Sequence, residues 1–183
     1  KETGPHVNRV AAYSLEIYET YATKKNIPRE EIDSQRDAIR MAAMLHDVGK
    51  VAISDIILKK PGRFTDDEYE VMKQHTVLGA RLFKDARSVF DEIAAEVAMN
   101  HHERWDGRGY PGYVDPESDN FSSEPKIKGK PKGKKGEDIP LFGRIVALAD
   151  VYDALSCKRV YKDAWDEDKV LDVIREGKGS QFD

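Results

Sequence analysis

Cysteine and long hydrophobic runs are nearly absent from this sequence of 183 residues. Cys157 is the single cysteine, which excludes an intramolecular disulfide framework and argues against a thiolate metal site. No uninterrupted apolar run is long enough to cross a bilayer, and we expect no signal peptide. An excess of positive charge is also missing. The 30 basic and 34 acidic side chains give a net charge of −4, so bulk charge gives no reason to expect a nucleic-acid polymer as partner.

Alternating strand patterns and internal repeats are missing as well. Hydrophobic residues make up 39% of the chain and charged residues 35%, which is typical of one globular domain with a highly charged surface. The chain has no initiator Met: it opens on KETGPHV and ends on GSQFD. We therefore expect residues 1–183 to be a single domain excised from a longer protein, whose regulatory input domain lies outside this sequence.

Helical periodicity dominates what is present. Apolar residues recur at i, i+3 and i+4 along most of the chain, which predicts an all-α fold, a single globular helical bundle. One helix has a capping box in its start signal, with Thr65 as N-cap and Glu68 three residues later. The predicted helices run from Pro5 to Tyr21, from Ile39 to a C-terminal cap at Gly49, from Thr65 to Phe83, over 89–102, over 141–156, and onward from Asp166.

Residues 112–139 stand apart because they are rich in Lys, Gly, Pro and Ser and lack periodicity. We predict a flexible insertion there. Its six lysines are balanced by six acids, which favours a solvated loop. A lid or docking surface is the alternative, because the insertion directly follows the motif HHERWDGRGYP at 101–111.

Histidine is distributed unusually. The five histidines all lie on the apolar face, or at the inward end, of a predicted helix: His6, His46, His75, His101 and His102. A single histidine in such a place is more often a satisfied core residue than a ligand. Five buried imidazoles without partners would be costly, whereas a metal cluster would satisfy them all.

Carboxylates accompany these histidines. Asp47 follows His46, and Asp150 interrupts an otherwise apolar helix face. Glu2 lies four residues before His6, although Pro5 places it outside the regular helix. Mixed His and carboxylate ligands suit Fe, Mn or Zn, and seven or eight of them suit two or three ions. Two ions about 3.5–4 Å apart, bridged by Asp47, could share a hydroxide that attacks a phosphodiester.

Two motifs resemble signatures of a known family. HDVGK (46–50) resembles the signature of the HD phosphohydrolase superfamily, and HHERWDGRGYP (101–111) resembles the second signature of its HD-GYP branch. Each motif is weak alone, but their order and spacing together are specific. The resemblance continues through residues 2–10, 45–62, 72–82, 139–155 and 158–165.

The resemblance implies an all-α HD-domain bundle that hydrolyses the bacterial second messenger cyclic di-GMP to pGpG or GMP. It implies two or three divalent ions, most often Fe, alternatively Mn, with Zn, Ni or Mg possible after purification. The implied metal ligands are His6, His46, Asp47, His75, His101, His102 and Asp150, with Glu2 as an extra carboxylate for a third ion. Besides Asp47, the implied catalytic and substrate-binding residues are Lys50 at the scissile phosphate, Asp153 orienting Lys50 or the attacking water, and Arg159 and Lys162 at phosphate and guanine.

The turn of Gly109, Tyr110 and Pro111 has two interpretations. It ends a helix and positions the paired histidines, and it could also bring Tyr110 to the ligand or bind a GGDEF-domain partner, as the family does. The resemblance further suggests a cytoplasmic domain, tethered to the membrane by other parts of the chain if at all, and a homodimer. Ser54 and Val160 replace prolines that are usual in the family, without changing a ligand.

Other functions remain open at this point. The substrate could be 3′,3′-cGAMP or a nucleotide monophosphate, because the motifs do not specify the bases. The domain could instead be a non-catalytic cyclic di-GMP sensor that signals by protein contact, although such sensors usually lose ligands. A structural helical domain with incidental histidines is the last alternative.

Overall fold

The computed structural model of this chain describes residues 4–85, 87–118, 132–157 and 165–183. Within these residues all regular secondary structure is helical, apart from one isolated bridge between Lys178 and Phe182, so the all-α prediction is confirmed. The α-helices are α1 (Gly4–Lys24), α2 (Arg29–Met44), α3 (Asp55–Leu58), α4 (Asp66–Lys73), α5 (His75–Arg81), α6 (Val89–Asn100), α7 (Leu141–Ser156) and α8 (Glu167–Glu176), with 3-10 helices η1 (Val48–Ala52) and η2 (Gly136–Asp138).

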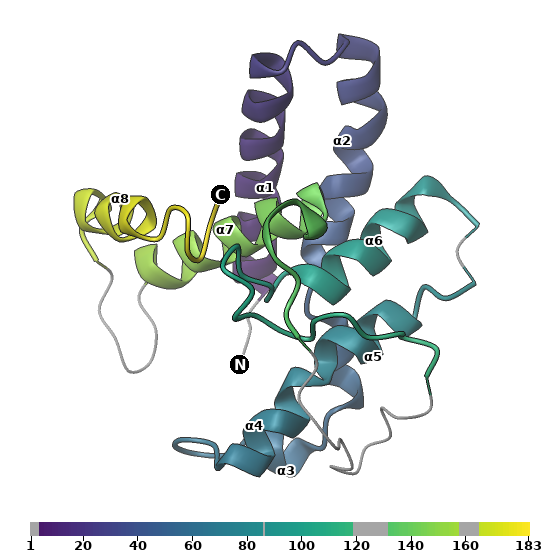
Figure 1. Cartoon of the computed structure of the whole chain (residues 1–183), viewed down its shortest axis with the longest axis vertical. Coiled ribbons are helices and arrows are strands. Elements are labelled where there is room, and N and C mark those ends of the chain that lie inside the picture. Colours follow the sequence, from purple (N-terminus) through teal and green to yellow (C-terminus); the bar gives the residue numbers. More distant parts are fainter. Residues whose placement is uncertain (1–3, 86, 119–131, 158–164) are drawn as a thin grey trace.

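Four helices form the centre of the bundle. Figure 1 shows α1 and α2 as an antiparallel hairpin, with α6 and α7 packed against its lower half. The core between them is built from small and branched side chains, among them Val10, Ala42, Ala43, Val97 and Ala149. Because Ala42 and Ala43 are small, the end of α2 can approach α1 and α6 closely, and the segment that follows α2 enters the interior.

The helix starts follow local sequence signals. The predicted capping box at Thr65 and Glu68 is confirmed, and a second one joins Ser88 and Asp91 at the start of α6. The helices predicted over 89–102, over 141–156 and from Asp166 correspond to α6, α7 and α8.

Two details of the predicted helices are wrong. Gly49 does not cap α2, which ends at Met44; it lies in η1, where an added Cβ would overlap the backbone of His75 and Gly79. Glycine is needed there for close packing of η1 on α5 and not for a helix end.

The helix predicted from Thr65 to Phe83 is divided at Gln74 into α4 and α5. The Thr76 hydroxyl donates to the carbonyl of Lys73, and His75 bonds the carbonyl of Met72, so side chains compete for backbone acceptors at this break. Leu82, the residue that follows α5, is 57% exposed.

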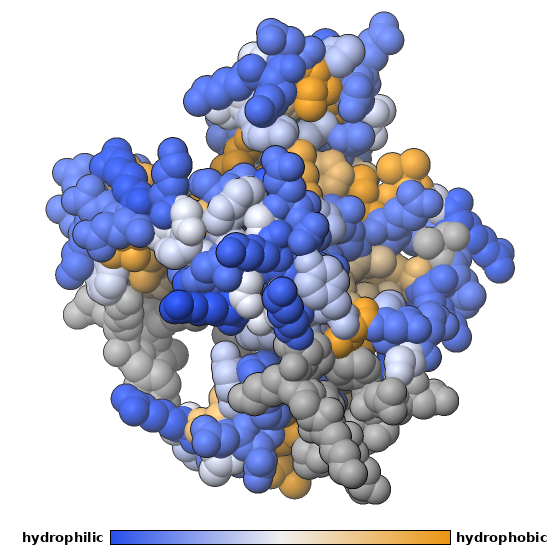
Figure 2. Space-filling model, in the orientation of Figure 1, coloured by the Kyte–Doolittle hydropathy of each residue, from blue (hydrophilic) through white to orange (hydrophobic). Residues whose placement is uncertain are grey.

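The described flanks of the insertion return to the segment 101–111. The backbone N–H of Tyr113 donates to the carbonyl of Lys132, and that of Gly136 donates to the carbonyl of Trp105. The surface in Figure 2 is mostly hydrophilic, with apolar side chains scattered in small groups. None of the helices in the described part of the chain is long and apolar enough to span a membrane.

Candidate metal centre

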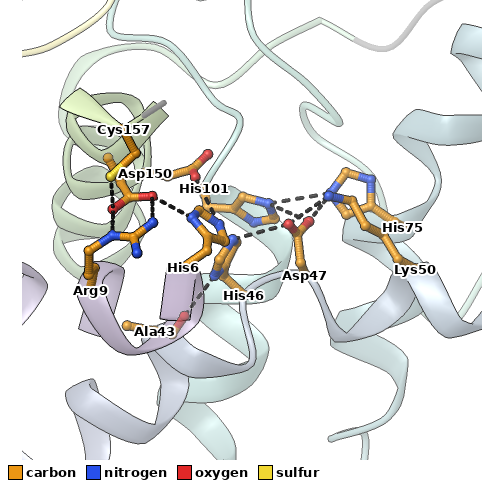
Figure 3. A network of polar contacts seen from close by, with 11 residues as sticks. His6, Arg9, Ala43, His46, Asp47, Lys50, His75, His101, Asp150 and Cys157 are labelled. Atoms are coloured by element: carbon orange, nitrogen blue, oxygen red, sulfur yellow. Dashed lines mark hydrogen bonds and ion pairs between the residues drawn. The ribbon is translucent and has the colours of Figure 1, made fainter. Parts of the chain in front are cut away.

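The chain between α2 and η1 places two candidate ligands inside the bundle. After α2 ends at Met44, a tight turn carries His46 and Asp47 under α1 and α6. His46 is fully buried, and Asp47 lies between it and His75. His75 comes from the start of α5 and His101 from the end of α6, so three separate elements meet at Asp47 (Figure 3).

Each of three imidazoles is oriented by a backbone carbonyl. The Nδ1 atom of His46 lies 2.7 Å from the carbonyl oxygen of Ala43, and that of His75 lies 2.6 Å from the carbonyl oxygen of Met72. Nδ1 of His101 faces the carbonyls of Val97 and Ala98 at 3.1 and 3.0 Å. A carbonyl can only accept, so Nδ1 carries a proton and Nε2 is the ring atom that faces the centre and can bind a metal ion.

The Nε2 atoms converge on acceptors. Nε2 of His46 and of His75 each lie 3.1 Å from a different oxygen of the Asp47 carboxylate. Nε2 of His75 also lies 3.3 Å from Nε2 of His101. Acceptor atoms this close repel one another unless a proton or a metal cation lies between them. The buried Nε2 of His46 and Oδ1 of Asp47 lack well-oriented hydrogen-bond partners, so the donor set fits divalent metal ions.

The candidate ligands form two groups that share one carboxylate. Asp47, His75, His101 and His102 have ligand atoms within 4.8 Å of one another, and so do His6, His46 and Asp47. Asp150 joins the second group, with Oδ1 3.5 Å from Nε2 of His6. The structure therefore brings together all the sequence-predicted metal ligands except Glu2, which lies outside the described residues.

The electrostatics of the centre attract positive charge. Burial alone would raise the pKa of Asp47, but its contacts with His101, His46 and His75 outweigh burial and hold that pKa well below its usual range. Burial opposes the charged form of His46, yet the carboxylates of Asp47 and Asp150 raise its pKa to about 9. Burial lowers the pKa of His102 well below its usual value, which keeps this ring neutral and able to coordinate.

Comparison with known proteins places this geometry in a family. The model of the HD domain matches residues 3–155. The chain belongs to the HD domain family. Among curated relatives of this HD domain, a cyclic di-GMP phosphodiesterase of Vibrio cholerae is 41% identical over 187 residues, covering 100% of this chain and 34% of the relative. A 3′3′-cGAMP-specific phosphodiesterase 2 of the same organism is 37% identical over 183 residues, covering 100% and 30%.

Other relatives agree with this assignment. A cyclic di-GMP phosphodiesterase of Thermotoga maritima is 39% identical over 161 residues, covering 88% of this chain and 36% of the relative. The crystal structure of a cyclic GMP-AMP specific phosphodiesterase from V. cholerae has the same fold, with a TM-score of 0.60 at 19% identity over 97% of this chain and 41% of that one. The HD domain spans about a third of the length of these curated relatives, and the predicted resemblance is confirmed.

A second layer of residues in this HD domain orients His6. Nδ1 of His6 lies 2.7 Å from Oδ2 of Asp153, and Nε of Arg9 donates to Oδ1 of Asp153 at 2.5 Å. Lys50 instead donates to Oδ2 of Asp47 at 2.6 Å. Asp153 contacts His6 and Arg9, and the expectation that it also orients Lys50 or the attacking water stays a prediction.

Tyr110 packs against His102 at the edge of the metal centre. Its ring stacks on that of His102, with centroids 4.8 Å apart, and burial raises the pKa of its hydroxyl. α6 already ends at Asn100, so the turn of Gly109, Tyr110 and Pro111 does not end that helix as predicted, but its Tyr110 packs against His102. Arg159 and Lys162, expected at phosphate and guanine, lie outside the described residues.

Several residues at this site were not predicted. Glu103 is buried and accepts from the backbone N–H groups of Gly112 and Lys134, which ties the insertion to the turn. The sequence signal that could have indicated Glu103 is an acidic residue placed directly after an apolar helix. No pattern in the sequence indicates that Arg9 pairs with Asp153, because that ion pair depends on the packing of α1 on α7.

A cavity of about 310 Å³ opens from the metal centre. Its lining includes the candidate ligands His101, His102 and Asp150, together with Arg108 and Gln181. Pockets for small molecules in proteins have volumes of about 300–1,000 Å³, so this cavity is large enough to hold part of a nucleotide.

Proposed function

We propose that this HD domain hydrolyses a phosphodiester bond of a cyclic dinucleotide with the help of two or three divalent metal ions. One observation carries the proposal: the Asp47 carboxylate lies between the Nε2 atoms of His46 and His75, each ring held by a backbone carbonyl at Nδ1. Two ligand groups that share Asp47 suit a multinuclear centre. The names of relatives that are 37–41% identical support the substrate class.

Divalent ions bound there would neutralise phosphate charge and lower the pKa of a water nucleophile. The chain's own residues supply the arrangement around that chemistry. Lys50 reaches Asp47 from the edge of the centre, where its ammonium group can also neutralise the scissile phosphate. Arg159 and Lys162 are proposed for the remaining phosphate and base contacts, and Glu2 for a third ion.

Cyclic di-GMP is the first candidate substrate that we propose, with pGpG or GMP as product. A second candidate, 3′,3′-cGAMP, is favoured by the relative named for that specificity, which covers the whole of this chain at 37% identity. Iron is the first candidate metal and manganese the second, because mixed His and carboxylate ligands suit both ions.

The deciding experiment measures metal content per chain after anaerobic purification, and then turnover of both cyclic dinucleotides by the same sample. We expect two to three equivalents of metal and release of pGpG or GMP. The double variant His46→Ala, Asp47→Ala should lose both metal and turnover while keeping its helical circular dichroism. Asp55→Ala, which removes an exposed carboxylate beside Lys59, is the matched control.

Full activity in the double variant would contradict the proposal. Complete metal loading with binding of cyclic di-GMP but no turnover of either nucleotide would favour the sensor. No metal after reconstitution would overturn the interpretation of the histidine cluster.

A further inference from the structure

We propose that Arg108 and Gln181 read a guanine base in the cavity beside the metal centre, and so determine which cyclic dinucleotides are accepted. The inference rests on the proposed function, because it assumes that the scissile phosphate lies at the metal centre. It concerns two residues of the same cavity that are not candidate metal ligands, Arg108 and Gln181, which line it together.

Arg108 is exposed, and within the described residues its guanidinium has no ion-pair partner. The neighbouring acids are already engaged. Asp106 binds the guanidinium of Arg104 through two hydrogen bonds of 3.2 and 2.9 Å, and Glu103 accepts from two backbone N–H groups. Of the two arginines that line the cavity, Arg108 is therefore the one whose donors face a ligand.

The backbone around Arg108 is held in place before any ligand arrives. Its N–H donates to Oδ1 of Asp106 at 3.0 Å, and the N–H of Tyr110 donates to the carbonyl of His102 at 3.2 Å. Gly109 packs so closely on the backbone of Glu103 and Arg104 that a Cβ there would overlap it. A fixed backbone reduces the entropy lost when the side chain binds a planar partner.

Gln181 reaches the cavity from the far end of the chain. Its backbone carbonyl accepts from the backbone N–H of Trp105 at 3.2 Å. Phe182 beside it is buried, so the backbone of residue 181 is held against the segment that contains Trp105. Its carboxamide is half-buried and forms no side-chain hydrogen bond with the described residues. A half-buried amide that lines a cavity offers one donor group and one acceptor, which suits the edge of a base.

The chemistry of this pair favours guanine. A guanidinium can donate two parallel hydrogen bonds to O6 and N7 of guanine, whereas adenine presents an amino donor in place of O6. Tyr69 lines the same cavity and is 46% exposed, and because the Lys73 ammonium lies over its ring, 4.8 Å from the centroid, a base would stack on the opposite face. A volume of about 310 Å³ is large enough for part of a nucleotide, so one guanine of the substrate is read here.

The test compares three substrates with the metal-loaded protein: cyclic di-GMP, cyclic di-AMP and bis(p-nitrophenyl) phosphate, a diester without a base. We expect the wild type to prefer cyclic di-GMP to cyclic di-AMP. Arg108→Ala should lower kcat/KM for cyclic di-GMP about tenfold, mainly through KM, and leave bis(p-nitrophenyl) phosphate unchanged. Gln181→Ala should also reduce the preference for guanine. Arg87→Ala, an exposed arginine at the opposite end of α6, is the control.

A binding measurement separates recognition from turnover. Titration of GMP and AMP should show that Arg108→Ala weakens GMP about tenfold and leaves AMP nearly unchanged. The inference is overturned if Arg108→Ala keeps the wild-type preference for guanine, or if it lowers kcat/KM equally for cyclic di-GMP and for bis(p-nitrophenyl) phosphate. Failure of the wild type to hydrolyse any of the three diesters would refute the proposed function instead, and GMP binding would still test Arg108.

Discussion

Asp153 offers a sharp test of how the centre is built, because its carboxylate binds His6 and Arg9 at once and, at the longer distance of 3.5 Å, accepts from the thiol of Cys157. Oδ2 lies 2.7 Å from Nδ1 of the buried His6, and Oδ1 accepts from Nε of Arg9. In Asp153→Asn one oxygen becomes an amino group, which cannot accept from either donor. The side chain of Arg9 is 36% exposed and can turn to water, so the remaining oxygen should stay with His6.

The expected effects follow from these contacts. A hydrogen bond to a charged group contributes about 1.5–3 kcal/mol, and solvent around Arg9 reduces its share to about 1 kcal/mol or less. We expect the free energy of unfolding of Asp153→Asn to fall by about 1–2 kcal/mol. The neutral amide also makes His6 a weaker ligand, and loss of such a partner typically lowers metal affinity about 10–100-fold.

Chemical denaturation of the metal-free protein measures the first quantity, and chelator competition with Mn²⁺ measures the second. Arg9→Met should reduce stability with a smaller effect on metal affinity, because Asp153 keeps its contact with His6. Asp172→Asn, in the exposed ion pair with Arg175, controls for the substitution itself. If Asp153→Asn binds Mn²⁺ as tightly as the wild type, Asp153 serves only the packing of α1 on α7.

Three further predictions concern the framework of the site. Gly49→Ala should lower the thermal midpoint severely, because the added methyl overlaps the carbonyl of His75, whereas Gly4→Ala, with open space at Cβ, should leave the midpoint nearly unchanged; equal midpoints would contradict the packing argument. Thr65→Ala should reduce the free energy of unfolding by about 0.5–2 kcal/mol through loss of an N-cap, measured by urea denaturation. Phe182→Ala should cost about 3–5 kcal/mol in the same assay, and a cost below 1 kcal/mol would show that the C-terminal segment is not anchored by this ring.

The parts of the fold that depend only on residues close together in the sequence were predictable from it. Helical periodicity and the capping box at Thr65 are local, and the structure confirms both. The end of α2 was not predictable in this way. Gly49 looked like a helix cap, but its role depends on the approach of α5, which no local pattern encodes.

The same distinction applies to the site. Histidines on apolar faces indicated the metal centre, because burial of an imidazole requires a partner. The orientation of each ring was beyond reach, since it depends on which carbonyl meets Nδ1 in the folded chain. The contact of Asp153 with His6 was not predictable for a related reason: His6 is 147 residues away in sequence, and helix spacing says nothing about α1 meeting α7.

The hydrogen bonds that join the two flanks of the insertion affect how much the sequence of this domain can change in evolution. The N–H of Tyr113 donates to the carbonyl of Lys132, and Glu103 binds both Gly112 and Lys134, so the two flanks are closed on each other beside the turn. With the flanks closed, each doubling of the chain between them costs only about 0.6 kcal/mol of closure entropy. The length and the sequence of residues 119–131 can therefore change in evolution without moving a metal ligand.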